Sequence, residues 1–375
     1  MQCDYFDAHR CRSCALMGVP YGDQVRAKAS RAAEALRGVA AGVEWHPPLT
    51  GPESEFRNKA KLVVAGRAGA PTFGILDREG RGVDLRRCGL YEPGLAATFD
   101  PLHRLVAELG IVPYDVPGRR GDLKHLIVTH SPDGEHLVRF VVRSPGSVDV
   151  LRAALPALRS ALPSARVVTA NVLAEHKAVL EGDTEVVLTD ESLLPIRLGD
   201  VTLFLGPRSF FQTNTRVATG LYAQARAWAE SLSPTVVHDY YCGVGGFALH
   251  LAAPTRRVVG VETSEEAVAA ATEGARANGT GSPDVEFVAG DATTVRLEGS
   301  ADLVVVNPPR RGLGPELAAW LDASDAAHLV YSSCHLGSLG RDLAAMPSWR
   351  AVEARAFDMF PQTDHLETAV LLTRR

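Results

Sequence analysis

The sequence has no apolar run long enough to span a bilayer. Its 375 residues contain no long uncharged apolar stretch, whereas a transmembrane helix needs about 18 such residues in a row. The N-terminus, MQCDYFDAHRCR, mixes acidic, basic and cysteine residues and lacks the apolar core of a secretory signal. We therefore expect a cytoplasmic protein that binds no membrane. Its six cysteines then favour metal binding or catalysis over disulfide bonds.

Lysine is scarce, at 5 of the 39 basic residues, and the other 34 are arginine. The net charge of −5 excludes a uniformly basic protein that coats nucleic acid, but it leaves room for a local basic groove. Residues 1–130 carry 18 basic and 15 acidic residues, whereas residues 201–375 carry 14 and 19. The N-terminal third is thus the better candidate for contact with an anion. Arginine suits phosphate contacts, although a GC-rich genome explains its excess more simply.

Fixed-period repeats are also absent, which excludes solenoids and propellers. Residues 1–50 hold three of the six cysteines and a helical pattern over 22–37. Residues 51–205 consist mostly of β-branched runs, with one helix near 147–162. Residues 206–375 alternate short apolar runs with alanine-rich segments, which is typical of a parallel sheet covered on both faces. The sequence predicts an α/β protein with a Rossmann-like C-terminal domain and a β-rich N-terminal and central part.

A glycine-rich turn follows the first apolar run of the C-terminal region. In HDYYCGVGGFALHLA (238–252), Gly243, Gly245 and Gly246 let the backbone approach a ligand at the start of a helix. Glu262 ends the second run, about 20 residues later, where a carboxylate can accept hydrogen bonds from ribose. A glycine loop and an acid also fit a nicotinamide dehydrogenase, or a purely structural turn. This motif alone therefore leaves the cofactor open.

Two further strand ends narrow the choice. Asp291 follows the third apolar run, and Asn307 begins the sequence NPPRRG after the fourth. Because ligands of open α/β sheets lie beyond the carboxyl ends of the strands, we expect Glu262, Asp291 and Asn307 to converge. The pattern resembles S-adenosylmethionine-dependent methyltransferases, in which these strand ends contact ribose, adenine and the reacting centre. Asn-Pro-Pro alone would also suit amino-methyltransferases that act on adenine, cytosine or glutamine nitrogen.

Cys334 follows the fifth apolar run and lies on the same predicted rim. A cysteine without such a context is usually an inert buried residue. Uracil C5 is a poor nucleophile, and addition of a thiolate at C6 creates an enolate that makes C5 reactive. C5 must then lose its proton. Glu367, in the turn before the last run, could act as the general base, with His365 or a water as the next candidates.

Five motifs together characterise one family. They are SFFQTN (209–214), DYYCGVGGF (239–247), NPPRRG (307–312), SSC (332–334) and FPQTDHLE (360–367). In this order they make the chain resemble the RNA uracil-C5 methyltransferases along its whole length. The resemblance implies Cys334 as the nucleophile and Glu367 as the base that deprotonates C5. It also implies contacts to S-adenosylmethionine from Gln212, Tyr241, Glu262, Asn307 and, in addition, Asp291.

Four cysteines outside the catalytic motifs form a second candidate site. Cys3, Cys11 and Cys14 have the spacing C-x7-C-x2-C, and Cys88 lies 74 residues further on. Four cysteines can hold a zinc ion or an iron–sulfur cluster, and composition does not decide between them. The resemblance implies a [4Fe–4S] cluster, because ribosomal-RNA members look like this and the transfer-RNA branch lacks these cysteines. Cys242 belongs to the glycine loop and is not counted as a ligand.

The segment GPESEFRNKAKLVV (51–64) also resembles the family's entry into its central domain. Arg57, Lys59 and Lys61 alternate there, and they could meet phosphate on one strand face or simply guard an exposed edge strand. We expect no OB-like RNA-binding domain before the cysteines. This resembles the short branch of the family, which modifies uracil 747 of 23S ribosomal RNA.

We therefore expect a cytoplasmic, monomeric 23S rRNA (uracil-C5)-methyltransferase that uses S-adenosylmethionine, binds RNA and carries a [4Fe–4S] cluster. Residues 1–50, with Cys88, would hold the cluster, residues 51–205 would bind RNA, and residues 206–375 would catalyse the reaction. One alternative is the same reaction on transfer RNA, which the four cysteines argue against, or on another ribosomal uridine. Another is a non-catalytic RNA-binding protein with a methyltransferase fold. The joint presence of Cys334 and Glu367 argues against that second alternative.

Overall fold

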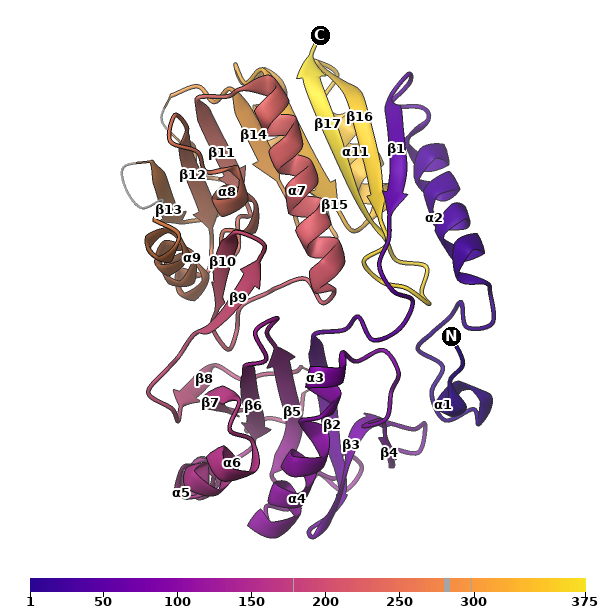
Figure 1. The fold of residues 1–375 in the computed structure, drawn as a ribbon, viewed down its shortest axis with the longest axis vertical. Coiled ribbons are helices and arrows are strands. Elements are labelled where there is room, and N and C mark those ends of the chain that lie inside the picture. The colour runs from indigo at the N-terminus through magenta and orange to yellow at the C-terminus, as the bar shows by residue number, and fades with distance from the viewer. Residues whose placement is uncertain (178, 280–283, 298) are drawn as a thin grey trace. The chain divides into compact units, whose positions relative to one another are not determined.

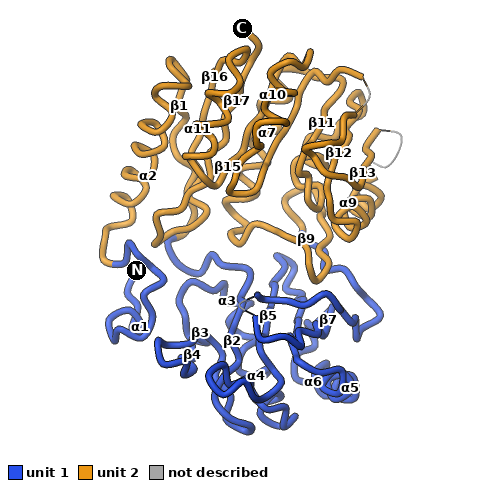
Figure 2. The backbone as a smooth tube through the Cα atoms, turned by 180° about the vertical axis from the view of Figure 1, so that it is seen from behind, with its two compact units in different colours: residues 1–17, 53–196 blue, residues 18–52, 197–375 orange. Residues whose placement is uncertain are grey.

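The computed structural model describes residues 1–177, 179–279, 284–297 and 299–375. The chain divides into two compact units (Figure 2): unit 1 comprises Met1–Met17 and Glu53–Ile196, and unit 2 comprises Gly18–Pro52 and Arg197–Arg375. The sequence-based division keeps residues 1–50 together. In the structure, that segment is shared between the units, with its three cysteines in unit 1 and its helix in unit 2.

Unit 1 is built on a seven-stranded sheet of order β4-β3-β2-β5-β6-β7-β8 (Figure 1). Its strands are β2 (Lys59–Arg67), β3 (Ala70–Leu76), β4 (Gly82–Asp84), β5 (Leu123–His130), β6 (His136–Val142), β7 (Ala165–Val172) and β8 (Thr184–Val187). Neighbouring strands are antiparallel, except that β6 and β7 are parallel. That parallel pair requires a crossover, which α5 (Pro145–Ala153) and α6 (Leu155–Ala161) provide. The sequence predicts this helical segment but not the parallel pairing that it serves.

One face of this sheet forms the core of unit 1. Along β2, Ala60, Leu62 and Val64 are buried in the core cluster, together with side chains of α4 (Phe99–Leu109), whereas the intervening residues are less buried. Lys59 and Lys61 therefore lie on the face of β2 opposite the core, because side chains alternate along a strand. The short helices α1 (Asp4–Asp7) and α3 (Pro93–Ala96) complete the unit.

Unit 2 contains an eight-stranded sheet of order β1-β16-β17-β15-β14-β11-β12-β13 (Figure 1). Its strands are β1 (Glu44–Leu49), β11 (Val236–Tyr240), β12 (Arg257–Glu262), β13 (Val285–Ala289), β14 (Leu303–Val306), β15 (His328–Ser333), β16 (Trp349–Phe357) and β17 (Glu367–Arg374). All neighbouring pairs are parallel except those that β17 makes with β15 and β16. The predicted α/β fold with a Rossmann-like C-terminal domain is confirmed.

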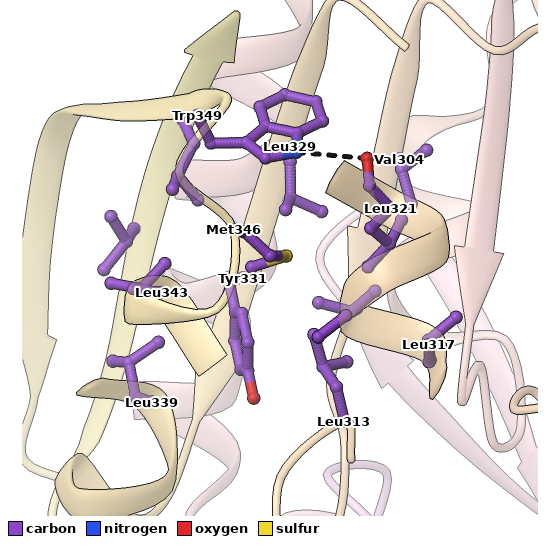
Figure 3. Close-up of a cluster of buried hydrophobic side chains, with 14 of the residues drawn as sticks. Val304, Leu313, Leu317, Leu321, Leu329, Tyr331, Leu339, Leu343, Met346 and Trp349 are labelled. Carbon is purple, nitrogen blue, oxygen red and sulfur yellow. Dashed lines mark hydrogen bonds between the residues drawn. The ribbon is translucent and has the colours of Figure 1, made fainter. Parts of the chain in front are cut away.

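Helices cover this sheet and close its core. They are α2 (Tyr21–Leu36), α7 (Thr215–Leu232), α8 (Gly246–Leu251), α9 (Glu265–Ala277), α10 (Pro315–Ala323) and α11 (Leu336–Ala344). Figure 3 shows Leu317 and Leu321 of α10 on one side of Tyr331, and Leu339 and Leu343 of α11 on the other. Separately, β9 (Leu194–Leu198) and β10 (Val201–Leu205) form a two-stranded sheet.

The topology of unit 2 brings several chain segments to one rim. The strand order of the sheet reverses direction at β11, which pairs with β12 on one side and with β14 on the other. Ligands of open α/β sheets bind at such a point, beyond the carboxyl ends of the strands. Because β17 runs in the opposite direction, it begins rather than ends at that rim. Its first residue is Glu367. Among the described residues, no helix is long and apolar enough to cross a membrane.

Candidate active site

A pocket of about 680 Å³ lies at the carboxyl rim of the unit 2 sheet. This volume is within the range of small-molecule sites in proteins. All seven residues that the sequence predicts for catalysis or cofactor binding line it: Gln212, Tyr241, Glu262, Asp291, Asn307, Cys334 and Glu367. The structure therefore brings together residues spread over 156 positions of the sequence, as the convergence of strand ends predicts.

The glycine loop adopts a backbone that most residues avoid. Tyr241, Gly243 and Gly245 have φ angles of +63°, +56° and +82°. At Gly245 a Cβ atom would lie 2.8 Å from the Phe287 ring, so a larger residue would displace β13 or the loop. Asp239 is fully buried beneath this turn, where its Oδ2 accepts a hydrogen bond of 3.0 Å from the amide of Ala248 in α8. Burial raises the pKa of Asp239 to about 8.

Glu262 connects the glycine loop to the end of β12. Its Oε2 accepts a hydrogen bond of 3.1 Å from the amide of Gly243, and its Oε1 accepts one of 3.0 Å from the amide of Ser264. Both oxygens belong to a carboxylate that lines the pocket. Oε1 also accepts a hydrogen bond of 3.0 Å from the Thr263 hydroxyl. Since each carboxylate oxygen has two lone pairs, Oε2 can still accept a hydrogen bond from a sugar hydroxyl.

Asn307 and Glu367 meet in a polar network beneath the pocket. Glu367 is 1% exposed, and its Oε1 accepts hydrogen bonds of 2.6 Å from Ser332 Oγ and 3.2 Å from Asn307 Nδ2. The Asn307 amide also donates to the carbonyl of Ser332 at 3.1 Å. Burial raises the pKa of Glu367 to about 7, and the two hydrogen bonds oppose that rise. A carboxyl group with such a pKa can exchange a proton near neutral pH.

Cys334 directly follows β15 and is partly exposed to the pocket. Burial and the neighbouring Glu367 raise the pKa of its thiol, whereas the Arg310 guanidinium lowers it. Arg310 also lines the pocket, and its Nη2 lies 3.1 Å from Nδ1 of His365. A cation beside the sulfur favours the thiolate, which is the nucleophilic form of cysteine.

The other three predicted residues also line the pocket and come from three different segments of the chain. Gln212 is buried and lies in the segment between β10 and α7. Asn214 caps the first turn of α7, because its Oδ1 accepts a hydrogen bond of 3.2 Å from the amide of Val217. Asp291 follows β13, and hydrogen bonds from the amide and hydroxyl of Thr293 lower the pKa of its carboxyl. Burial raises the pKa of the Tyr241 phenol.

Sequence reasoning did not single out Phe210 or Arg310 as site residues. Phe210 lines the pocket although its side chain is 71% exposed, which suits stacking against a planar base. Both residues lie inside motifs that the sequence displays, SFFQTN and NPPRRG. Phe210 could have been predicted from its position, because it is an aromatic residue two positions before Gln212.

The four remaining predicted ligands all lie in unit 1. Cys3 precedes α1, and Cys14 packs with Phe56 and Leu90 in a small apolar cluster that Cys88 also contacts. Burial, followed by the nearby thiols of Cys88, Cys11 and Cys3, raises the pKa of Cys14 to about 11. The four thiols are thus electrostatic neighbours. Within the described ranges, however, no three His, Cys, Asp or Glu side chains stand close enough to hold a metal ion.

The predicted phosphate contacts at β2 have different surroundings. Arg57 precedes the strand, and its Nε donates to the carbonyl of Lys59 at 3.2 Å. Burial, together with the charges of Lys61 and Arg139, lowers the pKa of Lys59 to about 8. Lys61 is exposed. Of the three, Lys61 is therefore the side chain most accessible to a phosphate.

Comparison with known proteins identifies the family. A 23S rRNA (uracil(747)-C(5))-methyltransferase of Halothiobacillus neapolitanus is 45% identical over the full length of both chains. One from Salmonella newport is 43% identical, also over the full length of both. The chain belongs to the RNA uracil-C5 methyltransferase family. Consistently, residues 191–375 match the family described as tRNA (uracil-5-)-methyltransferase. The resemblance predicted from the five motifs is confirmed.

A solved structure shares the whole fold. It is the Pyrococcus abyssi tRNA (uracil-54, C5)-methyltransferase in complex with S-adenosyl-L-homocysteine, with a TM-score of 0.81 and 26% identity. The match covers 97% of this chain and 85% of the other. The ligand in that relative is the demethylated product of S-adenosylmethionine. Family membership and this fold make the chain an S-adenosylmethionine-dependent methyltransferase.

Proposed function

We propose that the chain methylates C5 of a uridine in 23S ribosomal RNA, at position 747, forming 5-methyluridine. The observation that carries the proposal is one pocket in which Cys334 and Glu367 lie together with Gln212, Tyr241 and Glu262. A nucleophile and a base at the rim of a methyltransferase sheet are what uracil C5 chemistry requires. The names of the two full-length relatives support ribosomal RNA as the substrate. We further propose that the protein acts in the cytoplasm as a monomer.

The pocket offers suitable partners for S-adenosylmethionine, which would supply the methyl group. Glu262 would accept a hydrogen bond from a ribose hydroxyl, and Asp291 would accept from the adenine side, because Glu262 ends β12 and Asp291 follows β13, which pairs with β12. Gln212, Tyr241 and Asn307 would hold the remainder of the molecule. Gly243 lines the pocket without a side chain, so its backbone can approach a bound ligand closely.

Cys334 begins the reaction on the base. Its thiolate adds to uracil C6, the C5–C6 double bond opens, and the electron pair becomes an enolate with nucleophilic character at C5. Arg310, whose charge lowers the pKa of the thiol, favours the ionised sulfur before this addition. C5 then takes the methyl group, which leaves one hydrogen still bound to that carbon.

Glu367 completes the reaction by removing that hydrogen. Its carboxylate takes the C5 proton, the electron pair restores the C5–C6 double bond, and the bond between C6 and the Cys334 sulfur breaks. The hydrogen bonds from Ser332 and Asn307 hold the carboxylate in place. With a pKa raised to about 7, Glu367 is a stronger base than an ordinary carboxylate and is still ionised in a large fraction of molecules at neutral pH.

We also propose that Cys3, Cys11, Cys14 and Cys88 bind a [4Fe–4S] cluster. Four thiols form a donor set that suits such a cluster, and the contribution of Cys88, Cys11 and Cys3 to the raised pKa of Cys14 supports the proposal. Binding would require the sulfurs to move closer together than the structure has them. Because the cluster would use all four cysteines, its role would be structural.

The most direct experiment maps 5-methyluridine in total RNA from cells with and without the gene. We expect the modification to disappear at uridine 747 of 23S ribosomal RNA when the gene is deleted and to return with the wild-type copy. A copy encoding Cys334→Ala should not restore it. Loss at position 54 of transfer RNA instead would assign the chain the substrate of its Pyrococcus abyssi relative. No loss at any site would overturn the proposal.

A further inference from the structure

A second cavity lies beside the nucleophile. It measures about 300 Å³ and is formed entirely within unit 2. Four segments distant in sequence build it: helix α2, the loop after β14, the residues from Cys334 to the first turn of α11, and the loop before β17. We call it the flanking cavity, and its walls are Arg31, Ala35, Arg310, Cys334, His335, Leu336, Gly337, Asp364, His365 and Leu366.

The flanking cavity adjoins the active-site pocket but cannot take its place. Arg310, Cys334 and His365 line both. Glu367 and Asn307 line only the active-site pocket. A target uracil must contact Cys334 at C6 and Glu367 at C5, so the base belongs in the active-site pocket. Whatever fills the flanking cavity is therefore adjacent to the reacting base without being part of the reaction.

The walls of the flanking cavity carry more positive than negative groups. Arg31 and Arg310 are cationic, and Asp364 is the one carboxylate among the wall residues. Arg31 contacts that residue twice, with Nη1 at 3.7 Å from Oδ1 and with Nη2 donating to the carbonyl of Asp364. A guanidinium has five N–H donors, more than these contacts use. The Arg31 side chain is also 46% exposed, so a ligand can reach it.

We propose that the flanking cavity binds the sugar-phosphate linkage next to the target uridine, with Arg31 contacting the phosphate. This inference rests on the proposed function, since it requires RNA in the neighbouring pocket. An extruded nucleotide stays covalently attached to its neighbours, so a linkage must pass close to Cys334. Arginine recognises phosphate in a bidentate manner. Helix α2, from the segment that the sequence assigns to the metal cluster, thus belongs to the RNA-binding surface of unit 2.

The first test compares two arginines of the same helix. Arg26 is paired with Asp23, is 75% exposed and lies outside the walls of the flanking cavity. With a hairpin RNA that the wild-type chain methylates, Arg31→Ala should weaken binding about tenfold, the effect of losing one charged hydrogen bond. The plot of log binding constant against log salt concentration should become less steep, with the magnitude of its negative slope lower by about 0.7. Arg26→Ala should change neither, and Arg31→Lys should recover part of the affinity.

The second test removes the charge from the RNA. Hairpins carrying one uncharged methylphosphonate, either 5′ or 3′ of the target uridine, should bind the wild-type chain about tenfold more weakly at one of the two positions. Arg31→Ala should bind that hairpin and the unmodified one equally well. Binding of S-adenosyl-L-homocysteine should be the same in all variants, which shows that the catalytic unit is folded.

Two results would overturn the inference while leaving the proposed function intact. One is an Arg31→Ala variant that matches Arg26→Ala in RNA affinity and salt dependence. The other is a methylphosphonate that, at both positions, lowers the RNA affinity of the wild-type chain and of Arg31→Ala by the same factor. A wild-type chain that methylates no RNA would instead overturn the proposed function, and the inference with it.

Discussion

The two thiol sites of the chain differ in what holds them in place. Cys334 directly follows β15, a central strand of the unit 2 sheet that is hydrogen-bonded to β14 on one side and to β17 on the other. The four cysteines of unit 1 lie outside the strands: Cys3 precedes a four-residue helix, and Cys88 follows a three-residue strand. At the rim of a sheet, backbone pairing fixes where the strand ends lie, and with them the positions of the residues that they carry. A site between short segments needs a ligand to bring its side chains together.

The largest effects are expected when the two proposed catalytic residues at the rim of unit 2 are substituted separately. Cys334→Ala should form neither methylated RNA nor a covalent complex, because no thiolate can add to C6. Glu367→Gln should add and methylate but stall before C5 deprotonation, so product formation should fall about 10²- to 10⁴-fold. That variant should accumulate a protein–RNA species that survives denaturing electrophoresis and carries labelled methyl.

The double variant is the control for that experiment, and it should give no adduct. Normal turnover by Glu367→Gln would transfer the role of base to another group, with His365 or a water next. A covalent complex formed by Cys334→Ala would remove Cys334 from the mechanism. Because both residues are anchored by the sheet, neither substitution should prevent S-adenosyl-L-homocysteine from binding.

The unit 1 site should respond to the loss of a single ligand. Anaerobically purified wild-type chain should contain about four iron atoms and the corresponding sulfide, and Cys14→Ser should lose most of both. Cys242→Ala is the matched control, because Cys242 is also buried but belongs to unit 2. It should retain the iron. Zinc without sulfide in the wild-type preparation would contradict the cluster.

A smaller effect, on the pH profile, is expected when one hydrogen bond to Glu367 is removed. The base must be ionised, so the rate of adduct breakdown should rise with pH through about 7, the raised pKa of Glu367. The hydrogen bond from Ser332 lowers that pKa. Ser332→Ala should therefore shift the acidic limb of the profile to higher pH by about one unit, the effect of one hydrogen bond to a charged group.

Ser333→Ala is the control, since the Ser333 hydroxyl contacts the backbone of His335 rather than Glu367. Single-turnover decay of a preformed adduct is the suitable measurement, because it isolates deprotonation from the ionisation of Cys334. An unchanged profile in Ser332→Ala would show that Glu367 does not set the acidic limb.

The rim of unit 2 could be predicted because the relevant signals are local. Each of Glu262, Asp291, Asn307 and Cys334 follows an apolar run, and parallel strands place their carboxyl ends on one edge. The segment Glu44–Leu49 carried no such signal. It contains Pro47 and Pro48, yet it forms β1, because an edge strand tolerates residues that donate no hydrogen bond. Its place beside β16 depends on a pairing across 309 residues, from Glu44 to Glu353.

Two other features depended on tertiary structure. The flanking cavity combines Arg31 with Asp364, and nothing in either local sequence indicates that the two meet. The arrangement of Cys3, Cys11, Cys14 and Cys88 also depends on packing, because their spacing in the sequence identifies candidate ligands but not their geometry. Spacing therefore predicts which atoms could take part, whereas packing decides how close they come.

The position of β17 has a consequence for how the enzyme is assembled. This strand enters the sheet between β15 and β16, which both come from earlier sequence, and its first residue is Glu367. On the proposed mechanism, a partly folded chain in which β17 has not yet entered between β15 and β16 would have the nucleophile Cys334 but would lack the base Glu367. Such a species could capture RNA covalently without releasing it. We expect turnover to return during refolding only as the β17 amides become protected from hydrogen exchange. Insertion of β17 would then be the last folding step before the enzyme becomes active.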